Sequence, residues 1–372
     1  MGGPLRILHV VVNMNRGGAE TLIMNLYRNM DRSKVQFDFL TCKEGVFDKE
    51  IMQMGGNVHR IPYVTESGHR KYVRDLELFF KEHKEYKIVH SHLDKMSGFV
   101  LRSAKKANIP IRIAHSHNTM SEGGFLSRAY KWYAGNYVTS SATHLYACSQ
   151  AAAKWLYKHH SEKATLLNNG IETDRFRFSA NTRNIVRKEL NIKQDTFVLG
   201  HVGRFAHQKN HDFLIDVFAG IHQKIPNSCL LLAGDGPLKQ KIMGKVYQLK
   251  LEKKVYFLGV REDIHNLLQA FDMFVFPSLH EGLPVTLIEA QGAGLPCLIS
   301  NEITQEVDMG LNLVQYLPLS DKYIWMKKMI DLGKKQPRRE VYQEALSKKG
   351  YDIRKTAELT QNSYLDLGSE AV

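Results

Sequence analysis

Short runs of apolar and β-branched residues alternate with amphipathic helical stretches along the whole chain. Helical periodicity lies between the apolar runs, for example at 19–30, 71–83 and 211–223. Such alternation is typical of parallel sheets whose strands are joined by crossover helices. The predicted strands are 5–12, 35–41, 58–61, 88–91, 111–114, 144–147, 165–167, 197–202, 229–233, 255–258, 273–276 and 296–300.

The alternation forms two successive sets, separated by the polar segment 179–195, which carries an amphipathic helix pattern. A chain of 372 residues is also long enough for two domains. We therefore predict an α/β fold with two Rossmann-like domains, 1–185 and 186–351. The last segment, 352–372, reads as a helix that packs back on the first domain.

Charge and cysteine content narrow the choice of partner and compartment. The chain carries 51 Lys and Arg against 38 Asp and Glu, a net charge of +13, which favours an anionic lipid surface, nucleic acid or a phosphorylated substrate. The four cysteines show no CxxC spacing and read as small buried hydrophobes of a reducing compartment. The first apolar run, 7–12, is too short for a signal peptide, and no stretch approaches a membrane span. We expect a cytoplasmic protein.

The segment after the strand 273–276 holds two carboxylates in a strand-to-helix turn. Pro277 ends the strand, and Pro284 suits the first turn of the following helix. Glu281 then lies in the loop at the strand's carboxyl end, and Glu289 about one turn into the helix. Ligands of α/β sheets bind at that edge, where carboxylates suit sugar hydroxyls and helix-start amides suit phosphate. The alternative is a solvated Glu281 and a surface helix that carries Glu289.

Other strand ends carry polar, glycine-containing turns. Gly17 and Gly18 follow the first strand. Glycine there would let the backbone come close to a ligand, but a simple tight turn explains the two glycines about equally well. Arg204 and Lys209 flank the turn after 197–202 and could neutralise a diphosphate, unless they belong to an exposed basic loop. The turns LAGDGP at 232–237 and FLGVRED at 257–263 follow the same pattern.

Two HxH pairs end strands of the first domain. His115 and His117 lie in the segment IRIAHSHN at 111–118, and we expect the similar VHSH at 89–92 to lie nearby. By composition alone, such pairs could indicate a metal site.

Four motifs in this order, GRFxxQKN, LAGDGP, FLGxRxD and EGLPVTLIEA, resemble the nucleotide-binding half of glycosyltransferase family 4. The sequences GGAE at 17–20 and NNGIETDRF at 168–176 also match, so that the resemblance spans about residues 5–310. These are retaining enzymes of GT-B architecture, in which the two parallel sheets face across a cleft. The chain looks most like bacterial transferases that build exopolysaccharide, capsule or surface-antigen repeat units.

The resemblance implies a role for each matching position. By spacing, His117 occupies the family's active-site histidine position, and His115 is a competing candidate that we place one strand face away. The donor site that the resemblance implies consists of Arg204 and Lys209 at the diphosphate, Glu281 with the amides of Gly282 and Leu283 at the transferred sugar, Glu289 at the ribose hydroxyls, and Gly17 and Gly18 closing over the phosphates.

The family members that this chain resembles are metal-independent enzymes. The chain also has no DxD motif to hold a metal-bound diphosphate, so we expect neither a metal nor a cofactor. The nucleotide sugar is then a substrate, and UDP is favoured only because it is the commonest nucleotide among similar enzymes. One departure from the family lies at 300–306, SNEITQE, where many members carry a glycine-rich turn. The contribution of this segment to donor binding is therefore in doubt.

The implied reaction is transfer of a sugar with retention, by front-face displacement, to a saccharide or polyprenyl-diphosphate-linked acceptor. Arg204 and Lys209 stabilise the leaving diphosphate, Glu281 orients the sugar, and no catalytic base is evident. Segments 69–74 and 125–133 mix basic and aromatic residues, which fits either peripheral contact with the inner face of an anionic membrane or a solvated basic face over core aromatics.

Two other functions use some of the same features. A GT-B-like sugar-nucleotide epimerase or hydrolase could share the donor site. A basic nucleic-acid-binding protein would use the charge, but the charge is spread along the chain and no binding motif is present, so we expect no nucleic acid partner.

Overall fold

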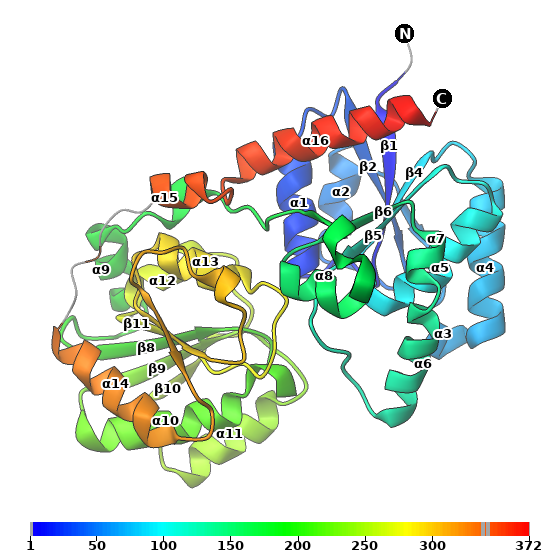
Figure 1. Ribbon diagram of the computed structural model, residues 1–372. Helices are drawn as coiled ribbons and strands as arrows, with labels where there is room; N and C mark the ends of the chain where they lie inside the picture. The colour runs from blue at the N-terminus through cyan, green and yellow to red at the C-terminus, as the bar shows by residue number, and fades with distance from the viewer. Residues whose placement is uncertain (1–2, 336–338, 340–342, 372) are drawn as a thin grey trace. The chain divides into compact units, whose positions relative to one another are not determined.

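The computed structural model describes residues 3–335, 339 and 343–371, which fold into two compact units (Figure 1). Unit 1 contains the chain up to Gly170 and again from Gly350, and unit 2 contains Ile171–Lys349. Each unit is a parallel sheet with helices on both faces. The predicted α/β class with two Rossmann-like units is confirmed, and the facing of the two sheets across a cleft stays a prediction.

The sheet of unit 1 has seven parallel strands in the order β3-β2-β1-β4-β5-β6-β7. Side chains alternate across its faces, so that Ile7 joins the core beneath α1 and α16 while Leu8 joins the core beneath α4 and α5. The strands are β1 (Leu5–Val10), β2 (Val35–Thr41), β3 (Val58–Arg60), β4 (Ile88–Ser91), β5 (Ile111–Ser116), β6 (His144–Ala147) and β7 (Thr165–Leu166).

The helices of unit 1 include its C-terminal segment. Helix α16 lies beside α1 in Figure 1, and the Gln361 amide oxygen accepts a hydrogen bond from the Asp31 backbone N–H at 2.7 Å. The helices are α1 (Gly18–Asn29), α2 (Asp48–Gln53), α3 (Val64–Ser67), α4 (His69–Glu82), α5 (Ser97–Lys106), α6 (Phe125–Gly135), α7 (Val138–Ser141), α8 (Gln150–Tyr157) and α16 (Ile353–Glu370).

Unit 2 holds a six-stranded parallel sheet in the order β10-β9-β8-β11-β12-β13. Helices α10, α11 and α14 cover one face, and α12 and α13 cover the other (Figure 1). The elements are β8 (Phe197–Val202), β9 (Ser228–Ala233), β10 (Val255–Phe257), β11 (Met273–Phe276), β12 (Cys297–Ser300), β13 (Val314–Leu317), α9 (Ala180–Glu189), α10 (His211–Lys224), α11 (Lys239–Gln248), α12 (Ile264–Ala270), α13 (Val285–Gly292), α14 (Lys322–Lys335) and α15 (Gln343–Lys348).

The predicted strands agree with the observed ones to within two residues at each end, but the sequence analysis missed β13. This strand pairs only with β12 at the edge of its sheet, and three of its four residues are half-buried. Its short, mixed sequence VQYL gives neither a long apolar run nor a clear alternation. The prediction that the cysteines are small buried side chains is confirmed, since all four are free and buried.

The boundary between the units lies earlier in the chain than the sequence suggests. We placed it after residue 185, at the helix within 179–195, but α9 belongs to unit 2. Arg183 and Arg187 on α9 both bind the Asp272 carboxylate before β11, and the fully buried Arg187 also donates to the Ala270 carbonyl at 3.0 Å. The polar sequence of this helix suggested a linker between domains. Its two arginines instead bind Asp272, which fixes the helix to unit 2.

Replacing Asp272 with Ala should therefore destabilise unit 2. The substitution leaves the Arg187 guanidinium buried without its carboxylate, a loss of about 3–5 kcal/mol for a broken buried pair. Urea unfolding measures the change. Glu344→Ala, which removes an exposed ion pair with Lys348, is the matched control and should change stability by less than about 0.5 kcal/mol. Equal effects of the two substitutions would contradict this account of α9.

Candidate active site

The carboxyl ends of β8 and β11 meet at the point where the strand order of unit 2 reverses. From β8 the chain continues to β9 on one side, and from β11 it continues to β12 on the other. Ligands of α/β sheets bind at such a reversal, beside the two outgoing loops. These loops, 203–210 and 277–284, carry the residues that the sequence analysis selects for the donor site. Parallel strand direction therefore brings them to one edge.

An ion pair joins the two loops. The Lys209 ammonium lies 2.6 Å from the Glu281 carboxylate, and both side chains are largely buried. Lys209 also lies 4.8 Å from the ring centroid of Phe276. The Gln208 amide donates to the His280 carbonyl at 2.8 Å, next to the pair. The alternative of a solvated Glu281 is wrong, because only 8% of this residue is exposed.

The ion pair between Lys209 and Glu281 leaves less positive charge available at this turn than the sequence suggested. Lys209 shares its charge with Glu281, whereas Arg204 is exposed and makes no ion pair or hydrogen bond with its side chain to any residue in the described part of the chain. We expected two fixed cations at this turn that could both neutralise a diphosphate. The structure instead holds one compensated cation and one that is available to an anionic ligand.

Glycines allow the turns after β8 and β9 to pack backbone against backbone. Gly234 has φ +137°, and a Cβ there would lie 2.1 Å from the Gly203 carbonyl oxygen. The Phe205 N–H donates to the Asp235 carbonyl at 3.0 Å across the same contact. The LAGDGP motif thus supports the turn that carries Arg204.

Helix α13 begins at Val285, directly after Pro284, so that Gly282 and Leu283 precede its N-terminus as predicted. Its first-turn amides have no acceptor within the helix and suit an anion. Glu289 lies in the middle of α13 and is half-buried. Burial raises the pKa of the Glu289 carboxyl from its ordinary 4.5 to about 7.

Helix α13 holds the chain directly after the segment 300–306, which departs from the family pattern. The Gln291 side chain is fully buried, donates to the Val307 carbonyl at 2.8 Å and accepts from the Met309 N–H at 3.0 Å. This clamp fixes the loop after β12 without a glycine-rich turn.

Gly17 and Gly18 lie at the start of α1 in unit 1. Gly17 caps the helix with an extended backbone, and a Cβ on it would meet the Glu20 carboxylate, while a Cβ on Gly18 would meet nothing within 4 Å. Neither residue needs the left-handed conformation that favours glycine. The flexible Glu20 carboxylate could move away from such a Cβ, so the predicted close approach of this backbone to a ligand stays a prediction.

Five histidines gather at the carboxyl ends of three adjacent strands of unit 1: His9 of β1, His90 and His92 in and after β4, and His115 and His117 in and after β5. Strand register pairs His9 with His90, and His90 with Ile113, so that all five side chains lie on one face of the sheet. We placed His115 one strand face from His117, which is wrong. Residues two apart share a face, and the two rings stack with centroids 4.0 Å apart.

His117 is the least buried of the five, and its backbone is fixed by Asp94. The Asp94 carboxylate accepts from the His117 N–H at 2.8 Å and from the Asn118 side chain at 2.7 Å. The expectation that the segment 89–92 lies near the His117 segment is confirmed, since His92 Nδ1 lies 2.9 Å from His117 Nε2. Sequence reasoning missed His9, because it lies inside the predicted strand 5–12 and reads there as an interruption of an apolar run.

Burial keeps the histidines neutral. It lowers the pKa of His9 and His117 to about 3 and that of His90, His92 and His115 well below the ordinary 6.5. In two groups of three, His9 with His90 and His92, and His92 with His115 and His117, potential ligand atoms lie within 4.8 Å of one another. Neutral imidazoles at that spacing can hold a metal or hydrogen-bond to one another.

The predicted site residues thus fall into two sets. Arg204, Lys209, Glu281, Gly282, Leu283 and Glu289 share the carboxyl edge of the unit 2 sheet, while Gly17, Gly18 and His117 lie in unit 1. Each set gathers around the strand-order reversal of its own sheet.

Two family descriptions match the chain, Glycosyltransferase Family 4 over residues 16–175 and Glycosyl transferases group 1 over residues 182–309. The putative glycosyltransferase EpsF of Bacillus subtilis is 40% identical over 96% of both chains. The chain belongs to glycosyltransferase family 4. A second relative, the UDP-Gal:alpha-D-GlcNAc-diphosphoundecaprenol alpha-1,3-galactosyltransferase of Escherichia coli, is 28% identical over 80% of this chain and 79% of its own.

Solved structures support the fold of this family 4 chain. The structure of Anabaena Alr3699/HepE with UDP and glucose has a TM-score of 0.79 at 21% identity and covers 97% of this chain and 99% of its own. WaaG, a glycosyltransferase involved in lipopolysaccharide biosynthesis, has a TM-score of 0.66 at 19% identity over 98% of both chains. The GT-B architecture is thereby confirmed, and the named relatives identify the protein as a hexosyltransferase.

The raised pKa of Glu289 predicts a pH-dependent stability. The folded state holds this proton more tightly than the unfolded chain, so ionisation between about pH 4.5 and 7 costs folding free energy. Glu289→Gln removes that cost. The variant should match the wild type below pH 4.5 and become more stable than it by on the order of 3 kcal/mol above pH 7. Urea unfolding at several pH values measures the difference in stability between the two proteins. A difference that does not change with pH would show that the pKa of Glu289 is not raised in the folded state.

Proposed function

We propose that the protein transfers a hexose, with retention, from a UDP-sugar to a lipid-linked saccharide during polysaccharide assembly at the inner face of the plasma membrane. The observation that carries the proposal is the buried Lys209–Glu281 pair at the strand-order reversal of unit 2, beside an uncompensated Arg204. This arrangement places the Glu281 carboxylate, which can accept hydrogen bonds from sugar hydroxyls, next to cations that can bind a diphosphate.

The predicted contacts of the diphosphate and of the transferred sugar have a physical basis in unit 2. Arg204 binds the diphosphate, because its charge is not used by another described residue. Lys209 also binds the diphosphate when the phosphate oxygens compete with the Glu281 carboxylate for its ammonium group. Glu281 and the amides of Gly282 and Leu283 hold the sugar at the start of α13. A diphosphate that draws Lys209 toward itself frees the Glu281 carboxylate for sugar hydroxyls, which couples the two halves of the donor.

The chemical step rests on charge stabilisation rather than on proton chemistry. Negative charge builds on the leaving diphosphate, where fixed cations act best because they need no reorganisation. We propose that a phosphate oxygen takes the acceptor proton on the same face, and that neither a metal nor a cofactor takes part.

The choice of donor and acceptor rests on named relatives. HepE binds UDP and glucose in its solved complex, and the Escherichia coli relative is named for a UDP-galactose donor and a diphosphoundecaprenol-linked acceptor. EpsF and the capsular polysaccharide glycosyltransferase CapH of Staphylococcus aureus are relatives of this chain. UDP and a polyprenyl-diphosphate saccharide are therefore the substrates to test.

UDP should raise the thermal unfolding midpoint more than GDP or ADP does, because a ligand that binds only the folded state stabilises it by about 2.7 kcal/mol at 100 times its Kd. Arg204→Ala should remove most of the shift, since it deletes the free cation. Glu281→Gln should keep the UDP shift but lower turnover with the UDP-sugar by about tenfold to a hundredfold, the worth of one hydrogen bond to a charged group.

Glu252→Gln is the matched control, because Glu252 is an exposed carboxylate that precedes β10 at the opposite edge of the same sheet. It should change neither binding nor turnover. The proposal fails if no nucleotide shifts the midpoint, or if Arg204→Ala and Glu281→Gln behave like this control.

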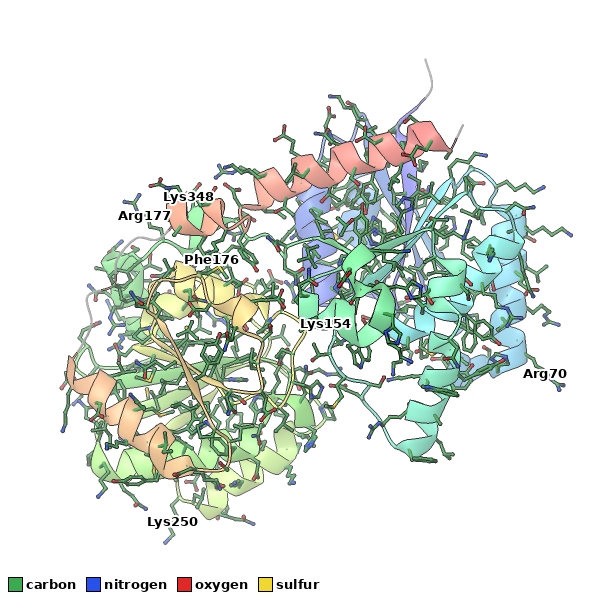
Figure 2. All side chains as sticks on the ribbon, viewed as in Figure 1. Arg70, Lys154, Phe176, Arg177, Lys250 and Lys348 are labelled. Carbon is green, nitrogen blue, oxygen red and sulfur yellow. The ribbon has the colours of Figure 1, made fainter. Side chains whose placement is uncertain are left out.

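The acceptor side of the proposal rests on an exposed apolar and basic surface of unit 1. Phe125, Leu126 and Trp132 of α6 are 84%, 83% and 59% exposed. Phe125 and Trp132 are therefore not core aromatics, whereas Tyr72 of the segment 69–74 is buried in the core of unit 1, as the solvated-face alternative expected. The structure joins the two segments that the sequence analysis selected, since the Tyr130 hydroxyl and His69 ring hydrogen-bond at 2.8 Å. Arg70, Lys71 and Arg74 are exposed on α4, and Arg70 is marked in Figure 2.

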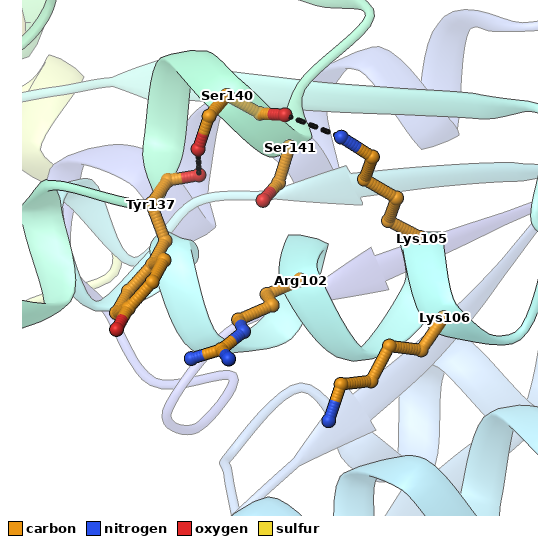
Figure 3. Close-up of a pocket in the computed structure, with 6 residues that line it drawn as sticks. All are labelled: Arg102, Lys105, Lys106, Tyr137, Ser140 and Ser141. Atoms are coloured by element: carbon orange, nitrogen blue, oxygen red, sulfur yellow. Dashed lines mark hydrogen bonds between the residues drawn. The ribbon is translucent and has the colours of Figure 1, made fainter.

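A basic pocket of about 300 Å³ extends this surface (Figure 3). Arg102, Lys105 and Lys106 line it from α5. The Arg102 guanidinium lies 4.3 Å from the ring centroid of Tyr137, whose hydroxyl lies 3.1 Å from that of Tyr133 on α6. Apolar side chains beside clustered cations suit the interface of an anionic membrane. In the described part of the chain, no helix is long and apolar enough to cross a membrane.

The protein should float with vesicles that contain anionic lipid at low salt, and less with neutral vesicles. Phe125→Ser with Leu126→Ser should weaken flotation at least about tenfold, because each apolar side chain contributes about 1.5–3 kcal/mol when buried. Tyr247→Ser, at a 72% exposed aromatic on α11, is the control. Failure of the wild type to float, or an equal effect of the control, would remove this part of the proposal.

A further inference from the structure

The five histidine rings form two hydrogen-bonded rows. In the first row, His9 Nδ1 lies 2.9 Å from His92 Nε2, and His92 Nδ1 lies 2.9 Å from His117 Nε2. In the second row, His90 Nε2 lies 3.1 Å from His115 Nδ1. The rows stack, with centroids 4.2 Å apart between His90 and His92 and 4.0 Å apart between His115 and His117.

The second row is anchored to the C-terminal helix. The Tyr364 hydroxyl on α16 lies 2.7 Å from His90 Nδ1, and Tyr364 is fully buried. At the other end of this row, His115 Nε2 is buried and has no partner among the described residues. The first row likewise leaves His9 Nε2 buried without a partner in the described part of the chain.

This geometry favours hydrogen bonding over metal ligation. A metal lies in the plane of each imidazole that binds it, at about 2.0–2.1 Å from the nitrogen for zinc. Within each row the in-plane nitrogens point at one another at hydrogen-bond distance, and the nearly parallel rings of adjacent rows cannot share one in-plane point. The groups of three would have to turn their rings and break these bonds to hold a metal.

In a row of neutral imidazoles, all hydrogen bonds must be donated in the same direction along the row. Each neutral ring carries one N–H, so three rings with two links leave a free proton at one end and a free lone pair at the other. If the free proton stood at His9 Nε2, it would be a buried N–H without an acceptor, which is rare in folded proteins. At His117, the only partly exposed ring, the free N–H can reach water or a ligand.

We propose that the row His9–His92–His117 donates in one direction and fixes the His117 proton on Nδ1, so that His117 presents a neutral N–H donor to a ligand oxygen. His9 and His92 are positioning residues in this arrangement. The ligand group is a hydroxyl or phosphate oxygen, which accepts from a neutral donor. The use of this donor in sugar transfer rests on the proposed function.

The arrangement also excludes one role for His117. Its Nε2 lone pair accepts from His92, and its Nδ1 carries the proton, so the ring has no free lone pair with which to take a proton from an acceptor hydroxyl. His117 orients a substrate oxygen and does not act as a general base. This agrees with the absence of a catalytic base in the sequence analysis.

Nitrogen-15 NMR of the histidine-labelled full chain tests the proposal, with the His117 signals assigned by their loss in His117→Gln. We expect a protonated Nδ1 and an unprotonated Nε2 in the wild type. In His92→Leu the His117 proton should move toward Nε2, the tautomer that an isolated imidazole side chain prefers. His90→Leu, an equally buried change in the second row, should leave the His117 tautomer unchanged.

A wild-type His117 that is protonated on Nε2 overturns the proposal, and this result needs no variant to fold. Addition of Zn²⁺ alone that shifts the ring-nitrogen signals of His92, His115 and His117 to the values of metal-bound imidazole would also overturn it, in favour of a metal site. If the tautomer is as expected but His92→Leu transfers sugar at the wild-type rate, the hydrogen-bonded row stands and the role of His117 in the proposed function fails.

Discussion

The common direction of the strands within each sheet is the constraint on which the rest of this structure depends. Because every strand in a unit runs the same way, every loop that leaves a carboxyl end lies on one edge. The strand order reverses beside β1 in unit 1 and beside β8 in unit 2, which are the positions where α/β sheets bind ligands. The histidines of unit 1 and the charged loops of unit 2 stand at these two places, although they come from distant parts of the chain.

Burial then decides what the charged groups at those edges can do. Lys209 and Glu281 tolerate burial because they compensate each other at 2.6 Å, whereas Arg204 remains in contact with water. No cation among the described residues compensates Glu289 in this way, and burial therefore favours its protonated form. The candidate donor site thus combines a matched pair, a free cation and a carboxyl whose pKa is near neutrality, a difference that the sequence does not show.

The histidine rows show how a sheet face can be polar without charge. A face of a parallel sheet that is covered by helices is usually apolar, and unit 1 follows this rule at Ile7, Phe37 and Ile113. Toward the carboxyl edge the same face changes to imidazoles, which stay neutral because they are buried and which satisfy most of their ring nitrogens mutually. The rows therefore carry a hydrogen-bond direction from the core to the edge without burying an ion.

The sequence by itself determined the α/β class, twelve of the thirteen strands and the loops that hold Arg204, Lys209, Glu281 and Glu289, because hydrophobic period and turn residues are local signals. It could not give the short edge strand β13, the place of α9 in unit 2, or the pairing of Lys209 with Glu281. It also could not bring His9 to His92 and His117, which are 83 and 108 positions away in the chain. Those contacts depend on strand order and register, which only the tertiary structure decided, because a residue's neighbours across a parallel sheet are set by the packing of whole βαβ units.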